Sequence, residues 1–366
     1  MKYLRDSPRF VIGSETQSQE CAEFVTGIQR VVCETHKGLV DLLGLEGIAI
    51  GWTHTAGLPR STVFQSLPYL AEDPILSGEE VQLAEIDALI VLDLPNQIDF
   101  RAIIKAKSDK NIKTFFLVYD IIPLIHPEFF TPKSVRSFKL YLQQLLHVAD
   151  FIIVTSDQVR KDIESLGWKY AAQVRVVPLG SVHQQRAPGN SNGDRISALC
   201  VNTIEPRKGH NRLLDAFDFL RKQGSDVDLT LIGRIGWNCD VLVERITNHP
   251  DFNGRLKWIA DADDNAVVRI AANCNVAVAP TEAEGFGLFV EEALTLGLKV
   301  VVSDIPVFRE RNYPNTYFAE LTGESLARTM LNAARADWVP VRSVEIRTMR
   351  DFSRDVADLI LENLLR

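Results

Sequence analysis

The sequence predicts an α/β protein with parallel β-sheets, and three observations lead to that class. Short apolar runs rich in valine and isoleucine alternate with longer segments of helical periodicity along the 366 residues. The alternation stops at the polar stretch RAPGNSNGD (186–194) and then starts again. A hydrophobic content of 46% and a charged content of 24% are those of a globular chain with one large core or two ordinary cores. We therefore expect two α/β domains.

The first half alternates short strands with helices. The expected strands are FVI (10–12), IAIGW (48–52), ALIVLD (88–93), KTFFLVY (113–119), FIIVTS (151–156) and VRVVPL (174–179). Among the helices, KSVRSFKLYLQQLLHVA (133–149) places Phe138, Leu142, Leu145 and Leu146 at helical intervals. Parallel strands joined by such helices are typical of a Rossmann-like domain.

The second half repeats this alternation, although the two halves share no sequence repeat at a fixed period. The expected strands are SALCVNTI (197–204), VDLTLIG (227–233), LKWIA (256–260), NVAVAP (275–280) and KVVVS (299–303), and the expected helices are RLLDAFDFLRKQ (212–223), NAVVRIAANC (265–274) and one that begins near Leu288. A last helix, DVADLILENLL (355–365), could pack on either half.

The interruption sets the expected domain boundaries. We expect a first Rossmann-like domain at 1–187, a linker at 188–194, a second Rossmann-like domain at 195–345, and a C-terminal helical segment at 346–366 that could pack back on the first domain. Neither half carries a GxGxxG motif after its first strand, so the sequence gives little support for a nicotinamide or flavin cofactor.

Composition argues against several classes of protein. The formal net charge of -8 argues against bulk attraction to nucleic acid or anionic lipid, although a local basic patch is compatible with it. The 5 cysteines are odd in number and form no CxxC pair, so we expect neither a disulfide framework nor a thiolate zinc site. No apolar run approaches the length of a membrane span, and MKYLRDSPRF lacks the apolar region of a signal peptide. We therefore expect a cytoplasmic protein.

The stretch VAPTEAEGFGLFVEEALTLGLKVVV (278–302) predicts a ligand-binding loop between a strand and a helix. The carboxyl ends of strands are where open α/β sheets bind ligands. Gly285 and Gly287 allow close approach to the backbone, and the helix start offers N–H groups to a phosphate. Glu292, one turn into the helix, could accept hydrogen bonds from a ribose diol, and Glu284 lies on the other side of the loop. The alternative is a glycine turn with two solvated glutamates.

Two further turns follow strands of the same half. EPRKG (205–209) places Arg207 and Lys208 before a helix, where adjacent cations are suited to a diphosphate, unless they belong to a solvated basic turn. GRIGW (233–237) follows the next strand and could line the same crevice, with Trp237 as a ligand contact or a packing residue.

The sequence does not favour a metal site. The 7 histidines have no ligand spacing. Asp261-Ala262-Asp263 spells a DxD motif, but it precedes the helix NAVVRIAANC and is better explained as a helix cap with solvated acids.

Four segments together resemble a known family. VNTIEPRKGHNRLLDAF, LIGRIGW, PTEAEGFGLFVEEAL and VVVSDIP are similar to the carboxyl-terminal half of the GT-B retaining glycosyltransferases of family four, whose most specific signature is E-x7-E, here Glu284 and Glu292. In the first half, VYDIIPLIHPEFF and FVTGIQRVV resemble a subgroup that includes bacterial mannosyltransferases of polysaccharide assembly. The resemblance implies two Rossmann-like domains that face each other across a cleft.

The resemblance also implies roles for individual residues. Glu292 would bind the donor ribose, Glu284 would contact the transferred sugar, and Arg207 with Lys208 would neutralise the departing diphosphate in place of a metal ion. The implied donor-binding residues are Glu292, Gly285, Phe286, Gly287, Leu288, Thr203, Gly233 and Arg234.

Three departures from the family pattern concern the donor clamp and the acceptor side. Thr203 stands where the family often has an arginine, Phe289 stands where it has a proline, and paired glycines near the amino terminus are absent, with Gly13 and Gly27 nearby.

Two residues of the first half are candidates for contact with the sugars. His126 either contacts the donor sugar or phosphate or is bonded within its own loop. Asp120 either orients the acceptor hydroxyl or caps the loop.

The resemblance thus implies a metal-independent retaining hexosyltransferase without a bound cofactor. Its co-substrate would be a nucleotide-diphosphate sugar, with GDP-mannose ahead of UDP-glucose, and its acceptor a saccharide or lipid-linked saccharide. It leaves room for peripheral contact with the inner face of the membrane or with an assembly complex, and implies no nucleic-acid partner. Two alternatives stay open: a sugar-nucleotide epimerase on the same scaffold, and a non-catalytic saccharide-binding scaffold protein.

Overall fold

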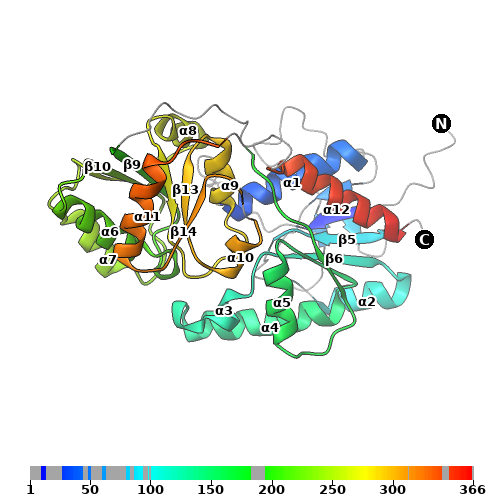
Figure 1. The fold of residues 1–366 in the computed structure, drawn as a ribbon. Helices are drawn as coiled ribbons and strands as arrows, with labels where there is room; N and C mark the ends of the chain where they lie inside the picture. Colours follow the sequence, from blue (N-terminus) through cyan, green and yellow to red (C-terminus); the bar gives the residue numbers. More distant parts are fainter. Residues whose placement is uncertain are drawn as a thin grey trace. The chain divides into compact units, whose positions relative to one another are not determined.

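The computed structural model describes residues 10–13, 27–43, 48–50, 60–62, 80–82, 86–93, 98, 100–182, 194–311, 313–339 and 346–364 (Figure 1). The chain divides into two units. The first contains Met1–Leu179 and Thr348–Arg366, and the second contains Gly180–Arg347. Each unit is built on a parallel 6-stranded sheet, which confirms the expected α/β class. The linker expected at 188–194 lies outside the described residues, apart from Asp194.

The sheet of the second unit has the strand order β11-β10-β9-β12-β13-β14. Its strands are β9 (Ile196–Val201), β10 (Val227–Ile232), β11 (Leu256–Ile259), β12 (Val276–Ala279), β13 (Lys299–Ser303) and β14 (Thr316–Ala319). Counted from β9, this is the 3-2-1-4-5-6 order of a Rossmann fold. The order reverses between β9 and β12, and this reversal positions the site described below.

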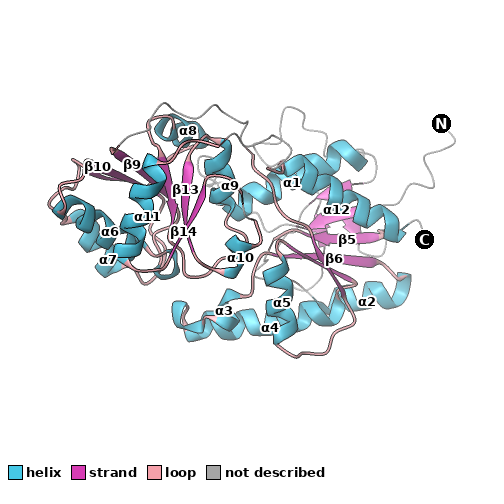
Figure 2. Cartoon of the chain, in the orientation of Figure 1, coloured by secondary structure: helices cyan, strands magenta, loops and turns pink. Residues whose placement is uncertain are grey.

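Helices cover both faces of this sheet, as Figure 2 shows. They are η5 (Pro206–Lys208), α6 (His210–Lys222), α7 (Asp240–Thr247), α8 (Asp264–Ala271), α9 (Leu288–Thr295), α10 (Pro306–Arg309) and α11 (Gly323–Arg335). Alternate residues of a strand point to opposite faces. Ala198 and Cys200 accordingly join the core with α6 and α11, whereas Leu199 joins the core with α8 and α9.

The sheet of the first unit has the order β2-β1-β5-β6-β7-β8. Its strands are β1 (Phe10–Gly13), β2 (Ile48–Ile50), β5 (Ala88–Val91), β6 (Lys113–Val118), β7 (Phe151–Val154) and β8 (Gln173–Val176), and β3 (Arg60–Thr62) with β4 (Glu80–Gln82) forms a separate antiparallel pair. The helices are α1 (Gly27–Leu43), α2 (Phe100–Lys110), α3 (Ile122–Ile125), η4 (Pro127–Phe129), α4 (Pro132–Val148), α5 (Asp157–Ser165) and α12 (Met349–Leu364). One core joins β5, β6 and β7 with α2, α4 and α5.

The C-terminal helix α12 packs against α1, far from it in sequence (Figure 1). The approach is close, because an added Cβ atom at Gly38 of α1 would overlap the side chain of Ser353 of α12. Ser353 is fully buried, and its hydroxyl donates to Met349 O at 2.9 Å. Two small residues therefore allow the last helix to complete the first unit.

The differences from the expected elements lie mainly at their ends. The strand expected at 197–204 ends at Val201, because the next residues bond instead to the loop after β10, with Ile204 N donating to Arg234 O at 2.8 Å. The helix expected at 355–365 begins at Met349, where Thr348 and Asp351 hydrogen-bond to each other's backbone N–H groups. The sequence patterns did not predict β14 or the β3–β4 pair.

Replacing Gly38 with leucine should lower the free energy of unfolding of the first unit by about 1–3 kcal/mol, because the added side chain forces α1 and α12 apart. Chemical denaturation of the full chain measures the change. The control is Gly27→Ala, at the start of α1, where an added Cβ atom meets nothing within 4 Å among the described atoms. Equal stability of the two variants would show that the approach of α1 to α12 is not tight.

Candidate functional site

Two loops of the second unit lie side by side at the carboxyl ends of neighbouring strands. β9 and β12 pair in parallel, with Ala198 opposite Val276. The loop after β9 leads through η5 into α6, and the loop after β12 leads into α9. Because the strand order reverses here, the two connections run to opposite faces of the sheet, and such a reversal is where open α/β sheets bind ligands.

The backbones of the two loops are held directly against each other. Glu282 N donates to Arg207 O at 2.7 Å. Gly209 has a φ of 69°, and a Cβ atom there would overlap the carbonyl of Pro280. Glycine is therefore required at position 209 for both its backbone conformation and this close approach.

Three of the predicted site residues meet at this junction. Lys208 Nζ donates to Glu284 Oε1, and Arg207 Nη1 lies 3.3 Å from Glu284 Oε2. Arg207 Nη1 also donates to Ala283 O at 2.8 Å, and Arg207 Nε lies 2.7 Å from Glu205 Oε1. The two cations therefore join the loop after β9 to the loop after β12.

The charges at the junction control the protonation of their neighbours. Burial by itself raises the pKa of Glu284, but the charges of Lys208 and Arg207 and their hydrogen bonds outweigh burial and lower the pKa below its ordinary value of 4.5. Burial and, to a smaller extent, the charge of Lys208 lower the pKa of His210 to about 4. Glu284 is therefore ionised and His210 neutral near pH 7.

The two helices behind the loops begin at glycines. Gly209 precedes α6 and Gly287 precedes α9, with φ values of 69° and 82°. A glycine has no side chain that could accept hydrogen bonds from the first N–H groups of the helix. Both helix starts are therefore suited to an anion at the junction of the loops.

The predicted loop Gly285–Leu288 is fixed at its centre. Phe286 is buried, and the guanidinium of Arg311 lies 3.6 Å from the centre of its ring. Arg311 also donates to Phe286 O. Glu292 lies one turn into α9 and is only 5% exposed.

The loop after β10 joins the same edge of the sheet. Ile204 N donates to Arg234 O, and a Cβ atom at Gly233 would overlap the carbonyl of Asn202. Thr203 is exposed between these contacts. The structure therefore places Thr203 and Gly233 beside each other.

The DxD motif has other roles. Asp263 is the N-cap of α8 and accepts from Ala266 N at 2.6 Å, which confirms the expected cap. Asp261 pairs with Arg234, with Arg234 Nε 3.0 Å from Asp261 Oδ1. The guanidinium of Arg234 is therefore engaged with the loop after β11.

The remaining candidates, Asp120 and His126, belong to the first unit and follow β6. Asp120 Oδ1 accepts from Ile122 N at 3.0 Å, so this carboxylate caps its loop. His126 Nδ1 lies 3.1 Å from Glu128 Oε1, and the imidazole side chain is 40% exposed. His126 can therefore still reach a ligand, and the cap does not exclude a further role for Asp120.

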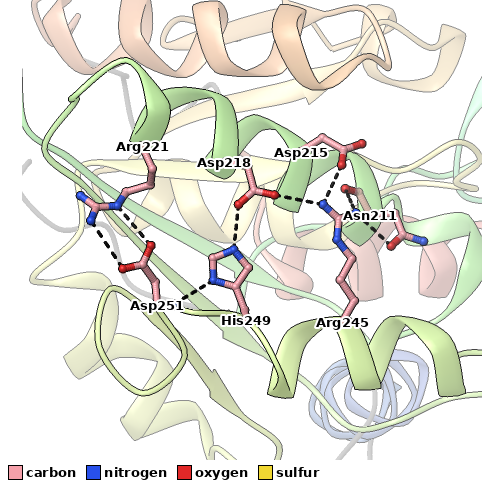
Figure 3. Close-up of polar contacts among 7 residues, drawn as sticks. All are labelled: Asn211, Asp215, Asp218, Arg221, Arg245, His249 and Asp251. Atoms are coloured by element: carbon pink, nitrogen blue, oxygen red, sulfur yellow. Dashed lines mark hydrogen bonds and ion pairs between the residues drawn. The ribbon is translucent and has the colours of Figure 1, made fainter.

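His249 and neighbouring acids form a polar cluster between α6 and the end of α7 (Figure 3). His249 Nε2 lies 2.7 Å from Asp218 Oδ1, and His249 Nδ1 accepts from Asp251 N at 3.1 Å. Arg245 donates to Asp215 at 2.7 Å and to Asp218 at 3.3 Å. Both ring nitrogens of His249 have partners within the unit and its side chain is only 9% exposed, so the cluster joins α6 to the residues after α7.

The sequence analysis missed charged residues that support the site. Glu205 lies within the quoted EPRKG and is buried beside Arg207. Glu291 adjoins Glu292 and is fully buried, where it pairs with Arg311 at 3.1 Å. An acid on an otherwise apolar helix was a visible signal, but nothing in the sequence indicated its partner.

Glu284→Gln should lower the free energy of unfolding of the second unit by about 3–5 kcal/mol at pH 7, because it leaves the poorly exposed Lys208 without its carboxylate and leaves Arg207 with Glu205 alone. The pKa of Glu284 is lower in the folded state than in the unfolded state, so ionised Glu284 stabilises the fold at pH values above the unfolded-state pKa. This stabilisation is lost as the pH falls through the folded-state pKa. The difference between wild type and variant should therefore shrink below about pH 4.

Urea denaturation at several pH values measures this difference. The control is Glu282→Gln, since the Glu282 ion pair with Arg212 is more exposed and should contribute about 1 kcal/mol or less. A difference that stays constant with pH would show that the charge of Glu284 does not stabilise the fold.

Three comparisons place this geometry among known proteins. Residues 181–328 match the family model of Glycosyl transferases group 1. The chain is 31% identical over 334 residues to the serotype-specific mannosyltransferase WbdA of Escherichia coli, which covers 84% of this chain and 39% of that relative. It is 30% identical over 213 residues to O-antigen chain mannosyltransferase B of Escherichia coli, with 54% of each chain covered. The chain thus spans less than two thirds of the length of these relatives.

The fold is also that of solved structures. The crystal structure of Anabaena Alr3699/HepE in complex with UDP and glucose matches with a TM-score of 0.62 and 14% identity, over 96% of this chain and 99% of that chain. At this identity the match concerns the fold alone. Residues 181–328 are therefore similar to the group 1 glycosyltransferases, within a chain that has the GT-B fold.

Proposed function

We propose that the chain is a retaining hexosyltransferase that moves a hexose from a nucleoside diphosphate to a saccharide or lipid-linked saccharide. The observation that carries the proposal is the junction of Arg207, Lys208 and Glu284 between the starts of α6 and α9. At this point the strand order of the Rossmann sheet reverses. The cations and helix N-termini are suited to a diphosphate, and the buried carboxylate is suited to the hydroxyl groups of a sugar. The similarity to named mannosyltransferases makes mannose the first candidate sugar and GDP-mannose the first candidate donor.

Lys208 is the proposed diphosphate ligand. Its charge and that of Arg207 are balanced by Glu205 and Glu284. A lysine has a flexible stem and can turn from Glu284 to a phosphate, whereas Arg207 is held by Glu205 and by Ala283 O. Lys208 would then stabilise the departing diphosphate, and Arg207 would keep the two loops in register.

The carboxylates have separate proposed roles. Glu292 binds the ribose diol, and Glu284 contacts the transferred sugar, with backbone amides at Phe286 and Gly287 near the phosphates. Gly285, Leu288, Thr203, Gly233 and Arg234 complete the proposed donor site. The reaction is front-face substitution: the bond from the anomeric carbon to the diphosphate oxygen breaks, the acceptor oxygen bonds to the same face, and the diphosphate oxygen takes the acceptor proton.

The first unit would supply the acceptor side. Asp120 follows β6 at the carboxyl edge of its sheet. His126 lies further along the same loop region, and its side chain is 40% exposed. We assign them to positioning of the acceptor hydroxyl and of the donor sugar, respectively.

The proposal also includes a cytoplasmic location with peripheral contact with an anionic membrane. Among the described residues, no helix is long and apolar enough to cross a membrane. Helices α2 and α4 pack together, and the acidic residue that they contain is Asp109. Their exposed cations are Arg101, Lys105, Lys110, Lys133, Arg136 and Lys139. Leu140 and Ile104 line a groove between these helices and are 59% and 45% exposed. Cations around exposed apolar side chains are suited to anionic lipid.

Lys208→Ala should weaken binding of GDP or UDP by at least about tenfold, which corresponds to about 1.4 kcal/mol, because a charge-assisted bond to phosphate is lost. Binding of the free nucleosides should change little. Calorimetry measures the affinities for the nucleotides and for the nucleosides. The control is Lys222→Ala, which replaces an exposed lysine at the end of α6. Equal losses for nucleotide and nucleoside would point to a folding defect and remove the role of Lys208.

Transfer of mannose from GDP-mannose to a mannose-containing acceptor should survive exhaustive treatment with EDTA. The reason is that Lys208 and the helix starts supply the positive charge for the leaving group, while Asp263 caps α8. Product formation before and after chelation measures this. Activity that is lost and then restored by manganese would overturn metal independence and reopen Asp261 and Asp263 as ligands.

Arg136→Glu combined with Leu140→Ser should abolish most co-sedimentation with vesicles that contain anionic phosphatidylglycerol. Binding to purely zwitterionic vesicles should be weak for every variant, since the cations have no partner there. The control is Val241→Ser on α7 of the second unit, which removes an apolar side chain that is 81% exposed. Undiminished sedimentation of the double variant would contradict contact through α2 and α4.

A further inference from the structure

Arg311 makes an unusual set of contacts with the loop before α9. It lies between α10 and β14. Its guanidinium lies 3.6 Å from the centre of the Phe286 ring, donates to Phe286 O, and lies 3.1 Å from Glu291 Oε1. One side chain therefore holds the ring and the carbonyl of the central residue of Gly285–Gly287.

The partner of Arg311 is a buried carboxylate. Glu291 is 0% exposed, and its Oε1 accepts from Arg311 Nη1 and, at 2.7 Å, from Tyr313 Oη. Burial raises the pKa of Glu291, and these two donors partly offset that effect. A buried ionic pair contributes little net stability compared with apolar residues of similar size. The main effect of the Arg311–Glu291 pair is therefore to hold the guanidinium of Arg311 in one position.

The loop is confined on its other side as well. Gly287 has a φ of 82°, and a Cβ atom there would overlap the ring of Phe308 on α10. Phe308 and Arg311 both belong to the connection from β13 to β14. That connection therefore sets the path of the backbone from Glu284 at the loop junction to Glu292 on α9.

We infer that Arg311, held by Glu291, is a positioning residue for the donor diphosphate. It fixes Phe286 and so directs the N–H groups at the start of α9 toward the loop junction at Lys208 and Glu284. The inference rests on the proposed function, because it assigns the fixed loop to a nucleoside diphosphate. It adds to that function a residue which acts through Phe286 rather than by touching the donor.

The test must separate positioning from stability. In the double variant Arg311→Met with Glu291→Gln, neutral side chains of similar length replace both charges, so neither charge is left buried and unpaired, and the new amide oxygen can still accept from Tyr313 Oη. The double variant should keep a Tm within a few degrees of wild type and bind GDP or UDP at least tenfold more weakly by calorimetry. Arg245→Met is the matched control, because it breaks the ion-pair network of α6 and α7 in the same unit without touching the loop (Figure 3). Its nucleotide affinity should equal that of wild type.

The outcomes are distinct. Wild-type Tm and wild-type affinity in the double variant would overturn the inference and leave the proposed function intact. Failure of wild type to bind GDP, UDP or their sugars would overturn the proposed function itself. If the double variant does not fold, Arg311→Lys decides, because it keeps a charge near Glu291 but loses the planar stack on Phe286. A tenfold loss of affinity at unchanged Tm supports the inference, and unchanged affinity contradicts it.

Discussion

The ion pairs between Glu284 and the two cations of the loop after β9 are the interaction on which the site depends. Glu284 lies in the loop after β12, 76 residues after Lys208 and 77 residues after Arg207 in the sequence. Its contacts with these two cations therefore join two distant segments of the chain. All three side chains are mostly buried, and Lys208 and Glu284 would each be a poorly compensated charge without the other, whereas Arg207 also pairs with Glu205. The junction therefore joins the residues just before α6 to those just before α9.

The proposed diphosphate site lies in an acidic chain, whose formal net charge is -8. Because Glu205 and Glu284 balance the charges of Arg207 and Lys208, the glycine-capped starts of α6 and α9 supply the remaining positive potential. In the proposed reaction, Glu284 holds Lys208 until the donor diphosphate competes for it, whereas Glu205 and Ala283 O keep Arg207 in place. The helix starts and Arg207 are then fixed before the donor binds, and Lys208 has to turn toward the leaving group.

Local patterns predicted much of the fold and the outline of the site. The apolar run around Val276–Ala279 and the following GFG indicate a buried strand, a loop and a helix, because burial and backbone freedom are properties of each residue and its near neighbours. The parallel alternation then places several loops at strand ends, and the edge shared by Lys208 and Glu284 follows from it. The cap at Asp263 was predictable for the same local reason.

The sequence by itself therefore determined most of the elements, the two halves and the loops that we propose carry the chemistry. Only the tertiary structure decided which side chains meet. The pairing of Arg311 with Glu291 depends on the path from β13 to β14, and the return of α12 to α1 depends on space at Gly38 that is filled by Ser353. The division of Arg207 between Glu205 and Glu284 depends likewise on the reversal of strand order. Hydrophobic periodicity requires only that a face be buried, whereas an ion pair or a close helix contact requires a particular partner, and strand order and packing alone bring that partner within reach.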